Sequence, residues 1–485
     1  MSCQYLNFVR GQWVPGSTRR TFPNINPANT DDIVGEFQAS GPDDVAAAFA
    51  AAESAQPAWA ALPPPRRGEY LFKAAEILES QLASAAKDMT REEGKTLPEA
   101  TGEVKRAINI LRYFGGEGSR LFSYQIPSER ENVFCFTLRK PLGVVALITP
   151  WNFPSAIPAW KMAPALVAGN TAVIKPASLA PLSALRLVEA LEKAGLPAGV
   201  VNFVTGSGGA IGDAMLEHRS LKAVSFTGSC DVGNRLYDKA TRRRLRVQLE
   251  MGGKNPTVVL ADANLDVAAA TLINAAFFST GQKCTACSRA VVERSVYEPL
   301  VETLVAKTRA LKVGNGLETG VDIGPAVDES QLNVDLEYIG IGQREGAKLL
   351  CGGKRLTGGT YDKGFFIEPT IFGDVTADMR IAQEEVFGPV LALMVADDFD
   401  DAMRLANSVR FGLSAAIISN DISRVHQFIN RIEAGLITVN LPTAGVEYQL
   451  PFGGTKESSF GMREQGPLAL DFYTESRTVY LKHTV

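Results

Sequence analysis

The sequence predicts an α/β protein with two mixed α/β domains. Short runs rich in β-branched residues alternate with helix-length segments, and such alternation indicates βαβ units around a parallel sheet. The chain has 485 residues, of which 46% are hydrophobic and 21% charged. A chain of this length and composition can bury several hydrophobic cores without disulfides or metals.

The expected elements follow in chain order. The alanine-rich segment 45–62 and the segment 66–85, with apolar residues at three-to-four spacing, predict helices. Helix-length segments then separate five strand candidates, which read GVVALI, TAVIK, VVNFV, KAVSF and RVQLE between residues 143 and 250. From about Asn255 the alternation repeats, with strand candidates ACSRAVVE, VLALMVA, LSAAIIS and LITVN.

Two further strand candidates have no obvious local partner. They are FCFTLRKPL, from Phe134 to Leu142, and RTVYLKHTV at the end of the chain. Strands with unpaired edges commonly pair elsewhere, and a neighbouring subunit is one option. The sequence therefore favours a homo-oligomer.

Composition excludes several function classes. There are 49 Lys+Arg against 53 Asp+Glu, a net charge of −4, so nucleic acid has no electrostatic reason to bind. No apolar stretch approaches a membrane span or a signal-peptide core. Six Cys without a disulfide framework are typical of a reducing cytoplasm. Only three His are present, each alone, which argues against a metal site or a Ser-His relay.

Turns after the first-half strands are the candidate ligand sites, because parallel sheets bind ligands beyond the carboxyl ends of their strands. TPWNFP contains an Asn amide that could donate to a developing charge, although Asn152 could equally cap the next helix. Lys175, in KPAS, suits a ribose or phosphate, or is a solvated surface residue. The glycine-rich turns TGSGGAIG and FTGSCDVG could hold an anion, but neither matches G-x-G-x-x-G.

Two more segments carry groups of chemical interest. Glu250 ends a strand candidate in LEMGGKNP, and Cys284 and Cys287 stand in GQKCTACSR. A Cys nucleophile and a carboxylate base would form a covalent route. Alternatively, the thiols are buried apolar groups and the Glu is solvated. The C-x-x-C pair lacks the further Cys or His ligands that a zinc site needs, so no metal is expected.

Read together, these motifs resemble the aldehyde dehydrogenase family. The resemblance covers essentially the whole chain and is carried by PWNFP, KPAS, FTGSxxxG, LEMGGKNP, GQKC, EEVFGPV and PFGGTKESSFGMREQG. Glu250 lies 34 residues before Cys284, a spacing that fits the family's base and nucleophile. A chance match of all seven blocks is negligible.

The resemblance implies a role for each catalytic candidate. Cys284 would attack the aldehyde to form a thiohemiacetal, with its oxyanion held by the Asn152 side chain and the Cys284 backbone N–H. After hydride transfer, Glu250 would activate the water that hydrolyses the thioester. Cys287 has no role in the family and is interpreted as packing. Because Glu250 is present, hydrolysis fits better than acyl transfer to coenzyme A.

The resemblance also implies a nicotinamide coenzyme. Lys175 would hold the adenosine ribose, Glu385 the nicotinamide ribose, and Phe387 would pack by the nicotinamide ring. Ser178 stands where members strict for NAD commonly carry Glu, so NADP is expected, with NAD also accepted. The other positions expected at the coenzyme are Thr149, Trp151, Gly228, Ser229 and Gly233.

The substrate is harder to predict. The late loop VNLPTAGVEYQLPFGGTKESSFGMREQG resembles the branch that oxidises 2-oxoglutarate semialdehyde (2,5-dioxopentanoate) in sugar-acid breakdown. The alternatives are succinate semialdehyde, whose dehydrogenases usually carry Arg at the position of Trp160, and a broad range of aliphatic aldehydes. Phe153 and Trp160 suggest an apolar funnel wall. The candidate carboxylate anchors are Arg112, Arg289 and backbone N–H groups near Thr443.

Other readings of the same resemblance are a non-catalytic structural protein on this fold and an enzyme with esterase activity only. The intact Cys284 and Glu250 argue against the first, and Lys175, Glu385 and Phe387 against the second. The implied architecture has a Rossmann-type coenzyme domain over 1–122 and 142–252 and an α/β catalytic domain over 253–464. A β oligomerisation arm over 123–141 and 465–485 would build a dimer or tetramer.

Overall fold

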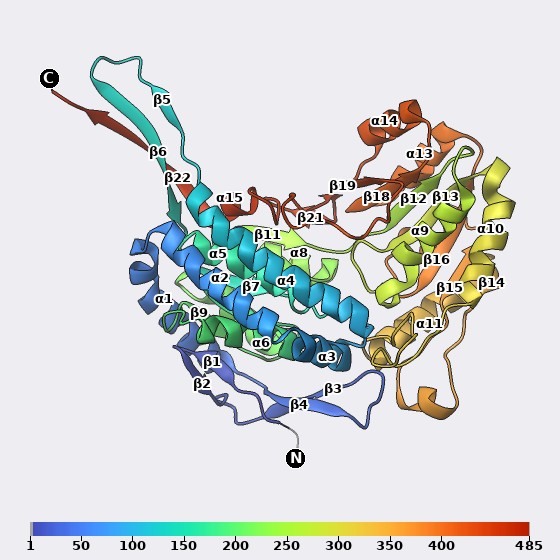
Figure 1. Ribbon diagram of the computed structural model, residues 1–485, viewed down its shortest axis with the longest axis horizontal. Coiled ribbons are helices and arrows are strands. Elements are labelled where there is room, and N and C mark those ends of the chain that lie inside the picture. Colours follow the sequence, from blue (N-terminus) through green and yellow to red (C-terminus); the bar gives the residue numbers. More distant parts are fainter. Residues whose placement is uncertain (1–2, 485) are drawn as a thin grey trace.

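The computed structural model describes residues 3–484 and consists of two α/β lobes and a projecting arm (Figure 1). The predicted domain segments begin at residue 1 and end at residue 485, so residues 1, 2 and 485 of those predictions lie outside the described residues. None of the described helices is long and apolar enough to cross a membrane.

The first sheet has eight strands, whose central five are parallel in the order β9-β8-β7-β10-β11. The chain moves outward from β7 through β8 to β9 and then crosses to β10, so the strand order reverses between β7 and β10. Ligands of open α/β sheets bind at such a switch point. The strands, in sheet order, are β2 (Gln12–Val14), β1 (Asn7–Val9), β9 (Val201–Phe203), β8 (Thr171–Lys175), β7 (Val144–Ile148), β10 (Leu221–Thr227), β11 (Arg246–Glu250) and β21 (Ser459–Phe460).

Helices cover both faces of this sheet. Successive side chains of a strand point to opposite faces: Val145 and Leu147 of β7 join one core with α2, α4, α5 and α6, while Val144 and Ala146 join another with α1, α7 and α8. These helices are α1 (Pro42–Ala61), α2 (Pro64–Ser80), α3 (Leu82–Glu93), α4 (Leu97–Glu117), α5 (Ala156–Val167), α6 (Pro181–Lys193), α7 (Gly208–Glu217) and α8 (Cys230–Arg242). The helix expected over 66–85 is thus divided between α2 and α3, which meet at Gln81.

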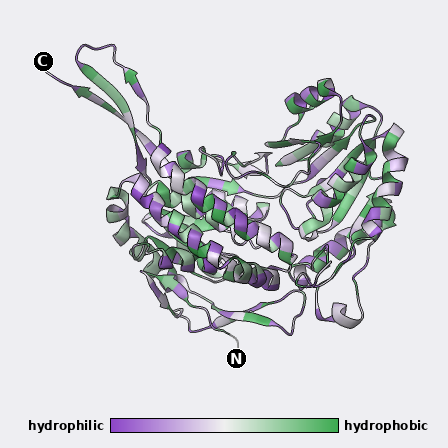
Figure 2. Cartoon of the chain, viewed as in Figure 1, coloured by the Kyte–Doolittle hydropathy of each residue, from purple (hydrophilic) through white to green (hydrophobic). Residues whose placement is uncertain are grey.

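The second sheet has seven strands, all parallel except the edge strand β14. In sheet order they are β14 (Lys348–Cys351), β15 (Thr370–Gly373), β16 (Val390–Ala396), β13 (Cys287–Glu293), β12 (Asn255–Val259), β18 (Ser414–Ile418) and β19 (Leu436–Val439). One face packs on α9 (Leu265–Phe277) and α10 (Arg294–Arg309), the other on α11 (Glu329–Arg344), α13 (Phe399–Asn407) and α14 (Ile422–Arg431). Apolar residues concentrate on the strands and on the inner sides of the helices (Figure 2).

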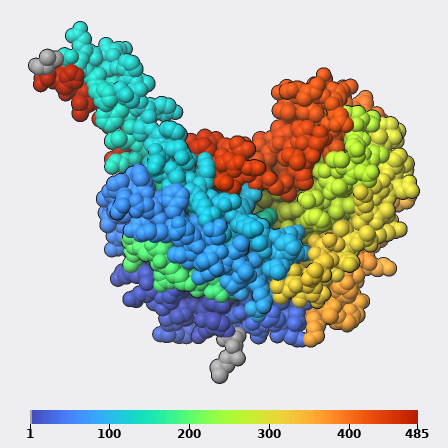
Figure 3. Space-filling model, in the orientation of Figure 1, coloured from blue at the N-terminus to red at the C-terminus, as the bar shows by residue number. Residues whose placement is uncertain are grey.

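The arm is a three-stranded antiparallel sheet that projects from the first lobe (Figures 1 and 3). Its strands are β5 (Gln125–Pro127), β6 (Val133–Pro141) and β22 (Thr474–Lys482). The two strands expected to lack a local partner pair with each other over nine residues, from Thr474–Pro141 to Lys482–Val133. Large apolar side chains of the arm remain exposed, among them Ile126, Phe134, Leu138, Tyr480 and Leu481.

Shorter elements complete the chain. A hairpin of β3 (Thr21–Ile25) and β4 (Ile33–Gln38) lies beside the first lobe, and β17 (Phe411–Gly412) pairs with β20 (Thr455–Lys456). The remaining elements are α12 (Arg380–Gln383), α15 (Ala469–Tyr473) and the 3₁₀ turns η1 (Gly118–Arg120), η2 (Phe278–Gly281) and η3 (Gly359–Lys363). Because β21 joins the first sheet, the chain returns to that lobe after building the second, and this return brings residues 451–466 to the junction between the two lobes.

Candidate active site

A cavity of about 220 Å³ lies where the turns after β7, β10 and β11 meet residues of the second lobe. The position agrees with the switch point of the first sheet. Its lining includes Trp151, Asn152, Gly228, Ser229, Cys284, Glu385 and Phe387. Seven residues that were predicted to take part in catalysis or coenzyme binding, and that come from separate parts of the sequence, therefore line one cavity.

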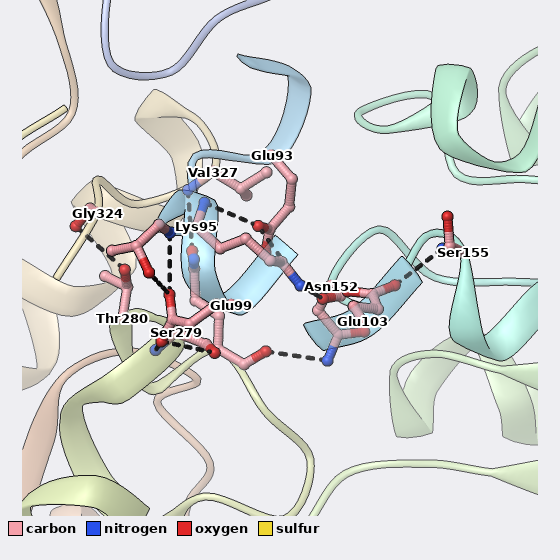
Figure 4. A network of polar contacts seen from close by, with 12 residues as sticks. Glu93, Lys95, Glu99, Glu103, Asn152, Ser155, Ser279, Thr280, Gly324 and Val327 are labelled. Carbon is pink, nitrogen blue, oxygen red and sulfur yellow. Dashed lines mark hydrogen bonds and ion pairs between the residues drawn. The ribbon is translucent and has the colours of Figure 1, made fainter. Parts of the chain in front are cut away.

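Cys284 follows a strained segment. Ser279 and Thr280 both have φ of 55°, in the left-handed region that non-glycine residues seldom adopt. Glu99 of α4 accepts a hydrogen bond from the Ser279 backbone N–H at 2.7 Å, and Thr280 donates to the Gly324 carbonyl (Figure 4). These bonds hold the chain in that conformation immediately before the thiol.

The electrostatics around Cys284 favour the neutral thiol. Burial, followed by the charges of Glu385 and Glu250, raises its pKa to about 12. The backbone N–H groups of Thr285 and Cys284 face the sulfur and act in the opposite direction. A thiolate in this environment therefore depends on those N–H donors and on a neighbouring proton acceptor.

The Asn152 side chain is buried and directed toward the segment that carries Cys284. Its amide nitrogen donates to the Gln282 carbonyl at 3.0 Å. A side-chain amide carries two N–H groups, so the second one can donate to an oxygen in the cavity. Gln282 is fixed in turn, because its side-chain oxygen accepts from the Val327 N–H at 2.9 Å.

A buried ion pair holds the backbone of Asn152 (Figure 4). The Lys95 Nζ donates to Glu103 at 2.6 Å and to the Asn152 carbonyl at 2.7 Å. The other oxygen of Glu103 accepts from the N–H groups of Ser155 and Ala156 at the start of α5. Lys95 and Glu103 thus anchor both ends of the turn that carries the Asn152 amide.

Glu250 ends β11 and is buried against β21 and the preceding glycine-rich loop. The Ser459 hydroxyl donates to Glu250 at 2.5 Å. Burial raises the pKa of Glu250 well above its usual range, and the neighbouring Glu464 raises it further, while Ser459 and Lys161 act in the opposite direction. A Cβ at Gly453 would lie 2.9 Å from Glu250 Oε1, so glycine leaves room beside this carboxyl.

Glu464 links Glu250 to helix α5. The Trp160 indole N–H donates to Glu464 at 2.7 Å, and Lys161 pairs with the other Glu464 oxygen. Lys161 also donates to Ser225 at 2.7 Å. The side chains of Lys161 and Glu464 are almost completely buried. A buried charge is costly unless it is paired, and here each charge is compensated by the other.

Aromatic and acidic side chains also line the cavity. Trp151 and Phe387 meet edge to face with ring centroids 5.4 Å apart, and Phe387 has φ of 64°. Glu385 accepts from the Gly253 N–H at 2.8 Å, and burial raises its pKa to about 7. Gly233 packs so closely that a Cβ there would lie 2.5 Å from the Met251 sulfur.

A second cavity of about 460 Å³ adjoins the ends of β7 and β8. Lys175 lines it, and burial lowers the pKa of that amine to about 8. Gly208, Gly209 and Gly212 of α7 line it too, and Arg235 and Lys239 of α8 complete it on the other side. Ser178 lies nearby on the same turn as Lys175 and donates to the Gly206 carbonyl at 3.2 Å.

Both cavities have features that favour a polar ligand. Three glycines leave the wall of the 460 Å³ cavity open, with nothing within 4 Å of an added Cβ at Gly208, Gly209 or Gly212. The hydroxyls of Thr149 and Thr227 are buried without a protein hydrogen-bond partner. Buried polar groups normally find partners, so these hydroxyls favour a polar ligand along the strand ends.

The predicted substrate residues are distributed differently. Trp160 is buried beside Phe452, and Phe153 lies under the Lys95 ammonium, 4.5 Å from its ring centroid. Thr443 is fully buried, its hydroxyl has no partner, and its carbonyl accepts from Ser414.

Two of the predicted carboxylate anchors lie elsewhere. Arg112 is exposed on α4 and pairs with Glu79 of α2. Arg289 is buried beneath the second sheet, where its guanidinium donates to the carbonyls of Lys254, Leu405 and Ala406. Because both guanidinium groups are occupied away from the cavity, the structure argues against either as an anchor.

The sequence matches the model of the aldehyde dehydrogenase family over residues 13–479. The chain belongs to the aldehyde dehydrogenase family. It is 49% identical to the alpha-ketoglutaric semialdehyde dehydrogenase of Bacillus subtilis (strain 168) over 478 residues, which cover 99% of this chain and 98% of that protein. It is 46% identical to the 2,5-dioxopentanoate dehydrogenase of Saccharolobus solfataricus, over 97% of this chain and 98% of that protein.

Solved structures confirm the aldehyde dehydrogenase fold. The NAD-dependent aldehyde dehydrogenase of Sinorhizobium meliloti superposes with a TM-score of 0.97 at 34% identity, covering 99% of this chain and 95% of that chain. A betaine aldehyde dehydrogenase of Staphylococcus aureus, in complex with NAD+, has a TM-score of 0.96 at 31% identity, with 99% and 95% covered. The predicted family, fold class and enzyme class are therefore confirmed.

Sequence reasoning missed the buried charges that support this aldehyde dehydrogenase site. Lys161 is the only charged residue of α5, which is otherwise apolar and buried throughout, and a Lys in such a helix signals a buried partner. No comparable signal marks Lys95 and Glu103, because EEGKTLPEATGE is as charged as an ordinary solvated helix start. Their burial becomes evident only when α4 packs against α5.

The Lys95→Met variant tests this network. The substitution leaves Glu103 buried without its counter-ion, and breaking a buried pair in this way typically costs about 3–5 kcal/mol. We expect a clearly lower thermal unfolding midpoint by circular dichroism. The control is Lys363→Met, which removes the same charge from an exposed pair with Asp31 and should leave the midpoint almost unchanged. Equal midpoints for the two variants would contradict the structural role of Lys95.

Proposed function

We propose that this protein oxidises 2-oxoglutarate semialdehyde to 2-oxoglutarate with NADP, and also accepts NAD. The observation that carries the chemistry is that the Cys284 thiol and the Asn152 amide line one cavity, with the Glu250 carboxyl close enough for its charge to raise the pKa of Cys284. The substrate is supported by relatives that are 46–49% identical over nearly the whole chain and bear the names of alpha-ketoglutarate semialdehyde and 2,5-dioxopentanoate dehydrogenases.

In the first step the Cys284 sulfur attacks the aldehyde carbon. A C–S bond forms, the thiol proton passes to solvent, and the electron pair of the C=O bond moves to the carbonyl oxygen, which becomes an oxyanion. The free N–H of the Asn152 amide and the Cys284 backbone N–H donate to that oxygen. Preorganised donors of this kind are typically worth about 10²–10³ in rate each, and the Lys95–Glu103 pair keeps the Asn152 donor in position.

The bound nicotinamide coenzyme supplies the hydride acceptor for this adduct. Lys175 and Ser178 would hold its adenosine half, and Gly228, Ser229 and Gly233 would border the pyrophosphate. Glu385 would bind the nicotinamide ribose, with Phe387, Trp151 and Thr149 around the ring. The two cavities and the unpartnered Thr149 hydroxyl support this placement.

Loss of hydride leaves a thioester on Cys284. Glu250 then takes a proton from a water molecule, the water oxygen attacks the thioester carbon, and the C–S bond breaks. The products are the carboxylic acid and the regenerated thiol. Because burial raises the pKa of Glu250, this carboxyl accepts a proton more readily than an ordinary glutamate, and it can then return the proton to the Cys284 sulfur.

NADP is favoured over NAD by the charges around the adenosine cavity. Lys175, Arg235 and Lys239 line it, and Ser178 adds no negative charge where a 2′-phosphate would lie. Asp213 also lines this cavity and pairs with Lys239 at 2.6 Å, so the lining carries three cations against one carboxylate. A cavity with this excess of cations suits a phosphate group.

The arm supports assembly into a homo-oligomer. Its outer strands β22 and β5 end the three-stranded sheet, and exposed Phe134, Leu138 and Leu481 give it apolar faces. Unpaired edges and exposed apolar side chains are features that a neighbouring copy would cover. We place the enzyme in the cytoplasm, in keeping with six free thiols.

A panel of aldehydes tests the proposed substrate. The measured quantity is kcat/KM for NADPH formation with 2-oxoglutarate semialdehyde, succinate semialdehyde, glutarate semialdehyde and pentanal. We expect 2-oxoglutarate semialdehyde to give the highest value and pentanal the lowest. Equal values would support a broad-range enzyme instead, and a maximum with succinate semialdehyde would support the rival assignment. The Cys284→Ala variant is the control, and activity that survives it would overturn the covalent route.

The pH dependence of turnover tests Glu250. With its pKa raised, this group is neutral at low pH and becomes the required base as pH rises through that pKa. The steady-state rate should therefore continue to increase with pH well above the pH range in which an ordinary Glu titrates. In Glu250→Gln this dependence should disappear, and each enzyme molecule should give one rapid turnover of NADPH followed by slow release.

Glu92→Gln is the matched control, because Glu92 is also buried with a pKa raised to about 7 but binds the N-terminus of α6. It should keep the wild-type pH profile. A Glu250→Gln enzyme with the wild-type profile would exclude Glu250 as the base.

The Ser178→Glu variant tests coenzyme choice. A carboxylate there would repel a 2′-phosphate, and we expect kcat/KM for NADP to fall about tenfold or more relative to that for NAD. Ser84→Glu adds the same charge to an exposed position on α3 and should leave the ratio unchanged. A ratio that is unaffected by Ser178→Glu would mean that Ser178 does not face the ribose.

A further inference from the structure

Arg106 is a cation without an anionic partner beside the active site. It lies on α4, three residues after Glu103 and so on the same face of the helix. Its guanidinium lies 5.8 Å from the centroid of the Trp160 ring and donates to the Val446 carbonyl and, at 3.2 Å, to Gln465 Oε1. The Arg106 Nε is buried and has no hydrogen-bond partner.

Gln465 adds a second unused donor at the same place. Its side chain is completely buried, and its φ of 56° is in the left-handed region. Gln465 Oε1 accepts from Arg106, while Gln465 Nε2 has no partner. Buried donors are costly to leave unpaired, so two of them joined by one hydrogen bond indicate an acceptor that the chain itself does not supply.

The carboxyl groups near Arg106 are engaged elsewhere. Both Glu103 oxygens are bound, by Lys95 and by the start of α5. Glu447 is exposed and accepts from Gln449. Among the described residues, the hydrogen-bond partners of the Arg106 guanidinium are two neutral groups, the Val446 carbonyl and the Gln465 amide oxygen. A carboxylate from outside the chain is the group that matches these donors, because a guanidinium and a carboxylate pair through parallel hydrogen bonds.

Arg106 lies near the groups that react and near the residues that position them. Glu103, one helical turn earlier, binds the turn that carries Asn152. Burial lowers the pKa of Arg106, whereas negative charge on Glu103, Glu447 or Cys284 raises it. The Trp160 ring, whose N–H is fixed by Glu464, gives an apolar surface beside the guanidinium. An aliphatic chain along that surface would connect a charged end at Arg106 with a carbonyl carbon at Cys284.

We propose that Arg106 and Gln465 form the subsite that binds the terminal carboxylate of the aldehyde substrate. Arg106 contributes the charge and its free Nε–H, and Gln465 contributes its free Nε2–H. The subsite selects aliphatic aldehydes that end in a carboxylate over uncharged aldehydes of the same length. This inference rests on the proposed oxidation of a semialdehyde and assigns its specificity to two residues.

The test compares two five-carbon aldehydes, glutarate semialdehyde and pentanal, which differ in the terminal carboxylate. The readout is the ratio of their kcat/KM values, because general damage to the enzyme lowers both and cancels. In Arg106→Met the ratio should fall about 10- to 100-fold. Gln465→Leu should lower it by less, since the guanidinium charge remains. Arg112→Met, on the same helix but paired with Glu79 at the surface, should keep the wild-type ratio.

The outcomes separate the inference from the function on which it rests. If the wild-type enzyme does not prefer glutarate semialdehyde to pentanal, the proposed function fails. If the wild-type enzyme has the preference and Arg106→Met retains it, the subsite is wrong while the function stands. Should Arg106→Met fail to fold, Arg106→Lys keeps the charge but loses the planar pair of donors. A several-fold lower ratio in that variant supports the subsite, and an unchanged ratio overturns it.

Discussion

The geometry of the site depends on hydrogen bonds made by charged side chains of α4 and of the segment just before it. Lys95 and Glu103 fix the turn of Asn152 in the first lobe, and Glu99 of the same helix fixes Ser279 in the second. The oxyanion donor and the thiol come from different lobes, yet the segments that carry them are both held by hydrogen bonds to α4 or to the residues just before it. Rigid placement matters, because electrostatic stabilisation of a reacting group depends on donors that do not need to reorganise. The ionic bonds are also protected from water, which strengthens them.

Burial governs the titrating groups at the candidate active site. It raises the pKa of Cys284 and of Glu250, so both are driven toward their neutral forms. Each depends on hydrogen bonds for its charged form: backbone N–H groups face the Cys284 sulfur, and Ser459 donates to Glu250. In a site of this kind the thiol loses and regains a proton, and the base gains and releases one, within a single catalytic cycle. The scarcity of histidine in the sequence is consistent with such chemistry, which needs no imidazole.

The α/β class followed from the sequence because strand and helix patterns alternate along the chain, and the family followed from the resemblance of its motifs. The strands β12, β14 and β15 of the second sheet were not predicted. Trp151, Glu385 and Phe387 of the cavity lining were predicted from the resemblance to the family. The positions of isolated charges were not. Arg112 and Arg106 stand six residues apart on α4, and only packing decides that Arg112 meets Glu79 in solvent while Arg106 lies under Trp160. Likewise, the mutual pairing of β6 and β22 joins segments more than 300 residues apart, a distance over which local pattern carries no information.

Three buried cations and the half-buried Arg106 illustrate how packing distinguishes charges with a structural role from charges available for recognition. Arg289 is satisfied by three backbone carbonyls, Lys161 by Glu464 and Lys95 by Glu103. Each is complete within the protein, as burial of a charge requires. Arg106 alone of the four keeps an unpaired donor, and its neighbour Gln465 keeps another. This arrangement lowers the stability of the fold, because an apolar residue could fill the space beside Trp160 without leaving donors unsatisfied. A role in binding would account for its presence. The unpaired donors stand at the active site and not in the cores of the lobes, which is where binding energy for a charged substrate is useful.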